Sequence, residues 1–258
     1  MFLEKMVSIK KEEIQRRKSC SWQREMEEAI AILPAARDLE GAIIQKAPIA
    51  VIAEVKPASP SAGVIQEEID LGRIASAYEA GGACAISVLT EPHFFKGDLS
   101  SLSVIKQRTA LPVLQKDFIL DPFQIFEGRA SGADGILLIA TLLDREELAD
   151  FVALARSLGL TPLVEIHSQD DLEKIPDLNL SIIGVNNRDL RSLEVDLKTT
   201  LRLKLEIPSG TKVISESGIR TSEDVRLLRE AGVHGILVGE ILMRSPDPAS
   251  KIRELLGR

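Results

Sequence analysis

Short apolar runs alternate with helical segments along the chain from residue 47 onward. Each run is rich in small and β-branched residues, ends at a Gly, Pro or polar break, and is followed by apolar residues at helical spacing. The pattern predicts strands at Val51–Lys56, Ala85–Thr90, Leu111–Gln115, Gly135–Ile139, Thr161–Ile166, Ile182–Val185, Thr211–Ser215 and Gly235–Val238.

Helix-start signals stand between these strands. Asp121 and Pro122 combine an N-cap with a proline at the first helical position, and Asp144 with Glu147 forms a capping box. The alternation of strands and helices favours an α/β fold of the (β/α)8 TIM-barrel class. An open doubly wound sheet is the alternative, but no Gly-x-Gly-x-x-Gly turn supports it. Further helices are predicted before Gly81, around Leu102–Arg108, and from near Ser168, Asp196, Thr221 and Asp247.

The first 46 residues precede these units and carry two apolar stripes at helical spacing, from Leu3 to Ile14 and from Trp22 to Leu33. We therefore expect one barrel domain, residues 1–258, of which 1–46 form an N-terminal helical extension. Such an extension would either cap one end of the barrel or line a binding site from above, and capping is the simpler role.

Charge and hydropathy narrow the classes of partner. The chain has 258 residues and a formal net charge of −7, and no basic stretch is long enough to follow a phosphate backbone. We therefore expect no nucleic-acid partner. No run of 18 apolar residues exists, and charges interrupt the first 18 residues, so neither a membrane span nor a signal peptide is expected.

The cysteines and histidines suggest neither a disulfide nor a metal site. Cys20 and Cys84 are far apart in the sequence and fit two reduced thiols in a cytoplasmic protein. His93, His167 and His234 show no metal-ligand spacing. We expect a cytoplasmic monomer that uses no metal and no organic cofactor.

The first predicted strand ends in a pair of opposite charges. Residue alternation places Ile52, Glu54 and Lys56 on one face of this strand and Ala53 and Val55 on the other. A carboxylate and an ammonium at the carboxyl end of a parallel strand fit an active site, because ligands bind at that end of such sheets. A structural ion pair inside the barrel is the alternative.

Polar residues also collect at the ends of other predicted strands, namely Lys116, Glu165, Asn186, Arg188 and Glu216. One charged residue in such a place is usually a solvated loop charge. Several of them converge on one pocket only if the sheet closes into a barrel, so we expect them to form a single polar site.

The last two predicted strands are followed by small residues. Ser217-Gly218 and Gly239 bring backbone N–H groups to the starts of helices, which is a frequent phosphate position in barrels. Two tight turns that need glycine are the alternative.

Aromatic side chains suggest a second ligand group on the other side of the barrel. Phe94, Phe95 and Phe118 stand in the loops after the second and third strands, although loops usually hold few aromatic residues. A planar apolar ligand would explain them. Packing beneath the N-terminal extension is an equal alternative for Phe94.

These residues together match a known pattern, Glu54-Val-Lys56-x-x-Ser59-Pro60-Ser61, Lys116-Asp117-Phe118, Glu165, Asn186-x-Arg188-Asp189-Leu190 and Glu216-Ser217-Gly218. With them, and over essentially its whole length, the chain resembles the indole-3-glycerol phosphate synthase family. The resemblance implies a barrel lyase of tryptophan biosynthesis without metal or cofactor. Its substrate would be an anionic arylamino sugar phosphate, 1-(2-carboxyphenylamino)-1-deoxyribulose 5-phosphate, which loses CO2 and water as the indole ring closes.

The implied reaction needs acids and a base. Ring closure needs an acid at the developing alkoxide, and Lys116 is the candidate. Loss of the hydroxyl as water needs a second acid, for which Glu165 is the candidate, and a base for the ring-nitrogen proton, which Lys56 or Lys116 would provide. The division of these roles stays open because such groups titrate together. Glu54 would hold both lysines in place, and Lys56 would alternatively pair with the substrate's carboxylate or phosphate.

The resemblance also implies the substrate-binding residues. Asn186 counts among the catalytic residues, and it would contact the ribulose chain together with Arg188, Glu216 and Ser217. The backbone of Ser217, Gly218 and Gly239 would bind the phosphate, and Phe95 and Phe118 would pack against the aryl ring. The remaining implied contacts are Ser59, Ser61 and Leu237.

Three positions depart from the commonest family pattern. Pro57 and Ala62 stand where basic residues are frequent, so steering of an anionic substrate would be weaker. His167 follows Glu165 by two positions, where a small polar residue is frequent, and we expect it to face solvent.

Two other functions are alternatives to the synthase. A phosphoribosyl-type isomerase on the same barrel would not need Lys56 and Lys116 together with Glu165. A ligand-binding protein that has lost turnover is the other alternative, and the intact set of Glu54 with these three residues argues against it.

Overall fold

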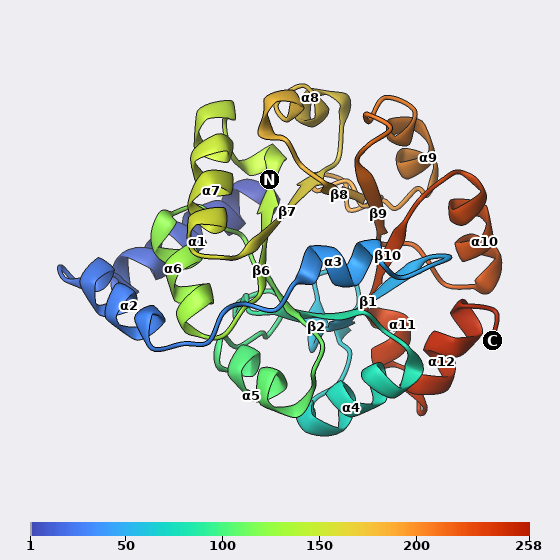
Figure 1. The fold of residues 1–258 in the computed structure, drawn as a ribbon, viewed down its shortest axis with the longest axis horizontal. Coiled ribbons are helices and arrows are strands. Elements are labelled where there is room, and N and C mark those ends of the chain that lie inside the picture. Colours follow the sequence, from blue (N-terminus) through green and yellow to red (C-terminus); the bar gives the residue numbers. More distant parts are fainter. Residues whose placement is uncertain (1) are drawn as a thin grey trace.

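The computed structural model describes residues 2–258 and shows a closed barrel of parallel strands surrounded by helices (Figure 1). The strands follow one another around the barrel in the order β1-β10-β9-β8-β7-β6-β5-β4, and β4 pairs again with β1. This closure confirms the predicted (β/α)8 barrel and excludes the open sheet. The barrel strands are β1 (Ala50–Val55), β4 (Ala85–Leu89), β5 (Val113–Lys116), β6 (Gly135–Ile139), β7 (Thr161–Ile166), β8 (Ile182–Asn186), β9 (Lys212–Glu216) and β10 (Gly235–Val238).

Helices cover the outside of the barrel, and several begin at the predicted caps. Asp121 and Asp144 each form a complete capping box, at the starts of α6 and α7. The outer helices are α4 (Leu71–Gly81), α5 (Ser100–Arg108), α6 (Pro122–Ala130), α7 (Arg145–Ser157), α8 (Gln169–Leu172), α9 (Lys198–Lys204), α10 (Ser222–Glu230), α11 (Glu240–Met243) and α12 (Pro248–Leu255), with 3-10 turns at Ala140–Leu142 and Pro176–Leu178.

A hairpin and a short helix are among the elements that the sequence pattern did not predict. A two-stranded hairpin, β2 (Ala58–Ser59) with β3 (Gly63–Val64), follows β1, and the short helix α11 follows β10. Both are too short to produce a hydrophobic period. The predicted boundaries of β5, β8 and β9 also shift, so that Lys116, Asn186 and Glu216 are the last residues of their strands rather than the first residues of loops.

The apolar residues form two layers, as residue alternation in the strands requires. Ile52 packs inside the barrel with Leu114 and Ile214, whereas Ala53 and Val55 pack between the barrel and its helices. Glu54 therefore points into the barrel along with Ile52, which confirms the predicted faces of the first strand.

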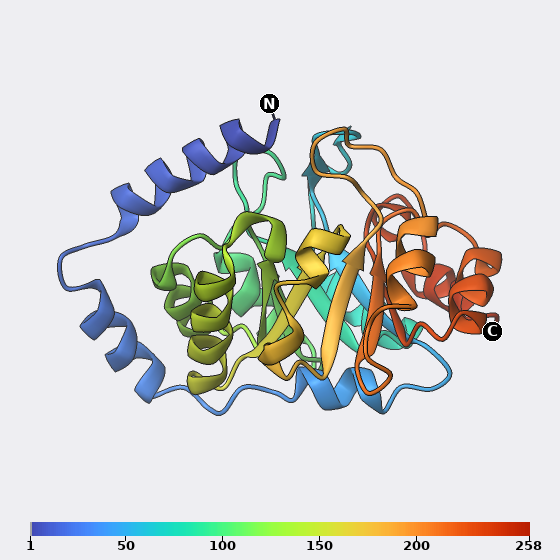
Figure 2. The same cartoon turned by 90° about the horizontal axis from the view of Figure 1, so that it is seen from above.

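The extension consists of α1 (Phe2–Arg17), α2 (Trp22–Ala31) and α3 (Leu39–Ile44). Figure 2 shows α1 above one end of the barrel, α2 descending along its side and α3 beneath the other end. Leu39 and Ile43 of α3 are at most 1% exposed and join the cluster inside the barrel. Capping is thus correct for α3, while α1 lies over the loops at the carboxyl ends of the strands.

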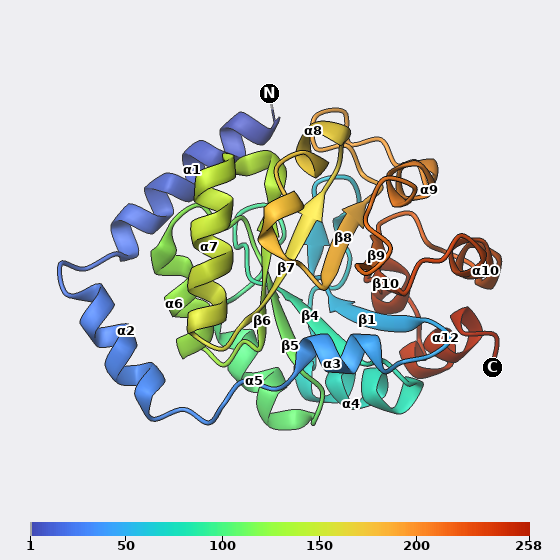
Figure 3. The same ribbon diagram turned by 45° about the horizontal axis from the view of Figure 1, so that its top comes forward.

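The helix α2 packs against α6, and Figure 3 shows the two helices side by side. The Trp22 ring contacts Phe123 and Phe126 edge-on, with ring centroids 5.5 Å apart in both pairs. These aromatic contacts attach the middle of the extension to the barrel wall.

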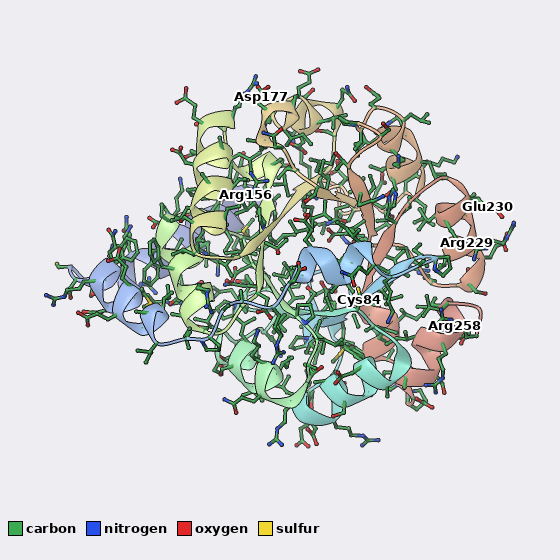
Figure 4. The ribbon with its side chains drawn as sticks, viewed as in Figure 1. Cys84, Arg156, Asp177, Arg229, Glu230 and Arg258 are labelled. Carbon is green, nitrogen blue, oxygen red and sulfur yellow. The ribbon has the colours of Figure 1, made fainter. Side chains whose placement is uncertain are left out.

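Both cysteines are free thiols, as predicted. Cys84 is buried and lies near the centre of the molecule, whereas Arg229, Glu230 and Arg258 lie at its rim (Figure 4). Cys20 is exposed.

Candidate active site

Two adjoining pockets open at the carboxyl ends of the barrel strands. Lys56, Lys116 and Arg188 line both, so the pockets form one continuous site. The first, here called the apolar pocket, is lined by Leu89, Phe95, Phe118, Leu137, Ile139 and Leu190, with Ser59, Ser61, Glu165 and Asn186 among its polar residues. The second, here called the polar pocket, is lined by Glu54, Glu216, Ser217, Gly218, Leu237, Gly239, Arg220 and Arg244.

Lys116 at the end of β5 is held between two buried carboxylates. Its Nζ lies 2.9 Å from Glu165 Oε2 and 2.9 Å from Glu216 Oε2, and both glutamates are 1% exposed. Burial works to lower the pKa of Lys116, but the charges of Glu165, Glu216 and the more distant Glu54 outweigh it and raise that pKa. Lys116 therefore remains an ammonium in a site from which water is largely excluded.

The two carboxylates that contact Lys116 have pKa values shifted in opposite directions. Burial and the negative charge of Glu165 raise the pKa of Glu216 against the attraction of Lys116. Burial acts on Glu165 in the same direction, but the charges of Lys116 and His167 outweigh it and lower the pKa of Glu165. The site thus places a carboxyl group that tends to keep its proton beside one that tends to lose it.

Glu54 pairs with Lys56 rather than with both lysines. Glu54 is fully buried, and its Oε1 lies 2.5 Å from Lys56 Nζ. The direct partners of Lys116 are Glu165 and Glu216, so the expectation that Glu54 holds both lysines is met by contact only for Lys56. Gly239 at the start of α11 makes room for this carboxylate, because a Cβ at that position would collide with Glu54 Oε1.

The polar pocket is built around a left-handed turn. Ser217 and Gly218 have φ angles of 65° and 80°, and a Cβ on Gly218 would lie 2.7 Å from Val195 Cγ1. Successive backbone N–H groups in a turn form concave arrangements that suit anions. The guanidinium groups of Arg188 and Arg220 line the same pocket, so the pocket combines N–H donors with positive charge.

Asn187 holds this turn in place, although no sequence motif singled it out. Its Nδ2 donates to Ser215 Oγ, to the Glu216 carbonyl and to the Ser217 carbonyl at 3.0, 2.9 and 3.0 Å. Its Oδ1 accepts from the backbone and the hydroxyl of Thr200 on α9. The side chain is 2% exposed. An Asn beside a polar motif gives no sequence signal that separates this role from a loop residue.

The β2–β3 hairpin brings two serines to the apolar pocket. Ser59 Oγ lies 3.4 Å from Ser61 Oγ and accepts the backbone N–H of Ala62 at 3.1 Å. Both serines line the apolar pocket, as expected for the Pro/Ser-rich turn after β1.

Phe95 and Phe118 line the apolar pocket, with ring centroids 6.1 Å apart. The loop that carries Phe95 is ordered by Glu91, whose buried carboxylate accepts the backbone N–H groups of His93, Phe94 and Phe95. Phe94 packs against the interior cluster that includes Met6 of α1, which favours the packing alternative for this residue.

The helix α1 is attached to the rim of the apolar pocket by a buried ion pair. Lys10 is 1% exposed, and its Nζ lies 3.0 Å from Asp117 Oδ1 and 2.8 Å from Glu13 Oε2. Asp117 also accepts the Thr90 hydroxyl, so it links α1 to the loops after β4 and β5. Asp117 belongs to the family pattern, but no sequence signal identified Lys10 as its partner.

The expectation that His167 faces solvent is wrong. Its side chain is only 8% exposed, and Nε2 lies 3.3 Å from Glu165 Oε1. Nδ1 lies 3.3 Å from Thr141 Oγ1, and the backbone N–H donates to Asp171 Oδ2. The ring is buried because α8 begins two residues later and turns Asp171 back toward the end of β7.

Within residues 2–258, no group of His, Cys, Asp and Glu side chains has an arrangement that could hold a metal ion. Among the helices that the structure describes, none is long and apolar enough to cross a membrane.

Comparisons with known proteins identify the family of this chain. The family model described as indole-3-glycerol phosphate synthase matches residues 3–255. The protein of that name from Desulforamulus reducens is 42% identical over 257 residues, which cover 99% of this chain and 97% of that protein. The one from Acetivibrio thermocellus is 50% identical over 217 residues, which cover 84% of each.

Solved structures show the same fold at lower identity. A mutant tryptophan synthase α-subunit from Pyrococcus furiosus superposes with a TM-score of 0.61 at 19% identity, covering 81% of this chain and 98% of that one. This likeness concerns the barrel alone. The family model and the relatives carry the assignment: the chain belongs to the indole-3-glycerol phosphate synthase family.

Proposed function

We propose that the two pockets hold the two ends of one substrate, 1-(2-carboxyphenylamino)-1-deoxyribulose 5-phosphate, and that Lys116 acts on the bond-forming centre between them. The family assignment makes the chain a carboxy-lyase of tryptophan biosynthesis that forms indole-3-glycerol phosphate. The site divides this reaction into phosphate binding, aryl binding and proton transfer, each with its own group of residues.

The charged and apolar walls of the site support this orientation. The phosphate fits the polar pocket, where the N–H groups of Ser217, Gly218 and Gly239 lie near Arg188. The aryl ring fits the apolar pocket, against Phe118 and the neighbouring apolar side chains. Lys56 lines both pockets, so it can reach either the phosphate or the anthranilate carboxylate of the substrate.

Ring closure joins the aryl carbon that bears the carboxylate to the ribulose carbonyl carbon. The carbonyl oxygen gains the electron pair of the broken π bond, and Lys116 is the acid that gives it a proton. Loss of CO2 then returns its bonding electrons to the ring and restores aromaticity. Glu216 supports this step by holding the Lys116 ammonium in place, a role that the sequence did not indicate.

Dehydration completes the indole. The hydroxyl formed in the first step leaves as water after taking a proton, for which Glu165 is the proposed acid. The ring releases one proton in return, to Lys56 or to Lys116. Asn186 lines the apolar pocket and accepts the Arg188 backbone N–H, so it is placed to contact the ribulose chain.

The position of Lys116 between two buried carboxylates, at the junction of both pockets, carries this proposal. The test mixes purified protein with the arylamino deoxyribulose phosphate and follows the fluorescence of the indole product, with Lys116→Ala in parallel and the exposed Lys198→Ala as a control. Turnover in the wild type and in Lys198→Ala, with loss in a folded Lys116→Ala, is expected. Equal turnover in Lys116→Ala would remove Lys116 from the mechanism.

We also propose that the chain works as a cytoplasmic monomer. Two free thiols, one of them exposed, suit a reducing compartment. Light scattering after size exclusion tests the oligomeric state, and a dimer at the working concentration would contradict it.

A further inference from the structure

His167 makes a contact with Glu165 that the proposed reaction steps do not use. Glu165 binds Lys116 through Oε2, and its other oxygen, Oε1, lies 3.3 Å from His167 Nε2. The imidazole is therefore attached to the outer side of the proposed acid. His167 does not line either pocket, so any effect it has on the reaction passes through Glu165.

Hydrogen bonds on the far side of the imidazole decide which nitrogen carries a proton. Thr141 donates its only hydroxyl proton to Asp171 Oδ2 at 2.7 Å. Asp171 Oδ2 also receives the backbone N–H of His167 at 3.0 Å, which keeps this carboxylate in the role of an acceptor. Thr141 Oγ1 has no proton left for His167 Nδ1, 3.3 Å away, and can only accept from it. Nδ1 is therefore protonated.

The other nitrogen then faces a carboxylate. In a neutral imidazole with its proton on Nδ1, Nε2 would present a lone pair to Glu165 Oε1, and two acceptors would meet at 3.3 Å. A proton on Nε2 turns this repulsion into the attraction of an ion pair. Nε2 is buried and forms no hydrogen bond within the part of the chain that the structure describes, and the contact that the structure gives it is the one with Glu165 Oε1 at ion-pair distance. The Lys116 ammonium on the inner side of Glu165 works against burial and lowers the pKa of this carboxyl group, which favours the proton on Nε2.

We propose that His167 and Glu165 together hold one proton, which Glu165 delivers to the hydroxyl that leaves during dehydration; this inference rests on the proposed function of Glu165. The proton moves from Nε2 to the carboxylate and from there to the hydroxyl, whose C–O bond breaks with its electron pair on oxygen to give water. The ring releases one proton to a lysine of the site. His167 regains a proton from solvent, so the protein returns to its starting state and one proton is taken up per turnover, which balances the loss of a carboxylate as neutral CO2.

None of the other charged groups around this pair contacts Nε2 in the described part of the chain, so its interaction is with Glu165. Lys116 and Glu216 lie on the pocket side of Glu165. Asp171 and Lys174 belong to the segment at α8, where Lys174 Nζ donates to the Ala140 and Leu143 carbonyls and lies 3.7 Å from Asp171 Oδ1. They fix the Nδ1 side of the ring, so only the Nε2 proton can transfer.

The protonation state can be read directly in the resting protein. The chain has 3 histidines, so nitrogen NMR of 15N-histidine-labelled protein gives few signals, and the signal lost in His167→Gln identifies His167. Both ring nitrogens should carry a proton in the resting protein. Glu165→Gln should remove the proton from Nε2 and leave the one on Nδ1. An unprotonated Nδ1, or an Nε2 signal that is the same in the wild type and in Glu165→Gln, would overturn the proposal.

A second variant keeps the NMR test decisive if Glu165→Gln does not fold. In Thr141→Val, the hydroxyl that accepts from Nδ1 is absent, while Nε2 still faces Glu165 Oε1. Nδ1 should lose its proton and Nε2 should keep its own. An unchanged spectrum would contradict the argument from Thr141. These measurements need no turnover, so they stand apart from the test of the proposed function.

Kinetics test whether the held proton is used. His167→Gln keeps an amide that can donate to Glu165 but has no proton to transfer, and kcat should fall by about tenfold or more with KM within about twofold. The kcat of the wild type should fall at alkaline pH as the pair loses its proton, and the pH profile of His167→Gln should lack this alkaline decrease. A purely structural loss would instead lower kcat equally at every pH. His93→Gln, whose side chain is 46% exposed beside Glu13, is the matched control. An unchanged kcat in His167→Gln would overturn the proposal.

Discussion

Glu165 and Glu216 bind the same ammonium group, each with Oε2 at 2.9 Å from Lys116 Nζ. They belong to β7 and β9, and β8 runs between these strands in the barrel. Gly184 on β8 leaves the space that the Glu216 carboxylate occupies, since a Cβ there would collide with Oε1. The shared ammonium therefore depends on a glycine that makes no chemical contribution of its own.

This arrangement predicts that Glu216 weakens the folded state as pH rises. Its pKa is raised by burial and by Glu165, so above about pH 4.3, the ordinary Glu value, the folded state keeps a proton that the unfolded state has lost. Stability should fall from there up to the raised pKa. Glu216→Gln should flatten this decline in Tm, measured by thermal unfolding from acid to mildly alkaline pH. An identical slope in wild type and variant would show that Glu216 is not the group responsible.

Removing Lys10 should destabilise the protein strongly. Lys10→Ala would leave Asp117 and Glu13 without the buried cation that both contact, and breaking one side of a buried ion pair costs about 3–5 kcal/mol. Urea unfolding measures the loss. The exposed neighbour Lys11 offers a matched control, and Lys11→Ala should change little. Equal stability of the two variants would mean that water takes over the role of Lys10.

Substitution of Gly218 should weaken anion binding beyond the effect of backbone strain. Gly218→Ala adds a Cβ at φ 80°, 2.7 Å from Val195 Cγ1, in the turn that lines the polar pocket. Gly159→Ala adds a Cβ at φ 76° with nothing within 4 Å, so it carries the same strain of about 1–2 kcal/mol without the collision. Calorimetric titration with inorganic phosphate should show a loss of about tenfold or more only in Gly218→Ala. A similar loss in both variants would assign the effect to general destabilisation.

The apolar pocket should respond to a different probe. Phe118→Ala removes an aromatic wall that is 8% exposed, and affinity for anthranilate should fall by about tenfold while affinity for phosphate stays the same. Competitive inhibition by each compound provides the measurement. A parallel loss of both would show that the two pockets are not separate subsites.

Local periodicity explains why much of the site could be predicted from the sequence. Alternation along β1 fixed the direction of Glu54 and Lys56, and parallel closure then brought Lys116 and Glu165 to the same end of the barrel. These conclusions need only the strand period and the rule that barrel loops gather at one face.

Contacts between distant segments could not be predicted in this way. Glu216 stands 100 positions from Lys116, and no period relates the two residues. His167 was expected in solvent because its burial depends on Thr141 and on Asp171 of a four-residue helix. Packing of that kind leaves no repeat in the sequence.

The path of the extension bears on how the chain folds during its synthesis. Residues 2–46 leave the ribosome before any barrel strand, yet Leu39 and Ile43 of α3 belong to a cluster that includes Ile214 of β9 and Leu237 of β10. Their binding surface is complete only after nearly the whole chain has been translated. The N-terminal extension is thus synthesised first but packs among the last segments, and until then its apolar side chains are available to chaperones.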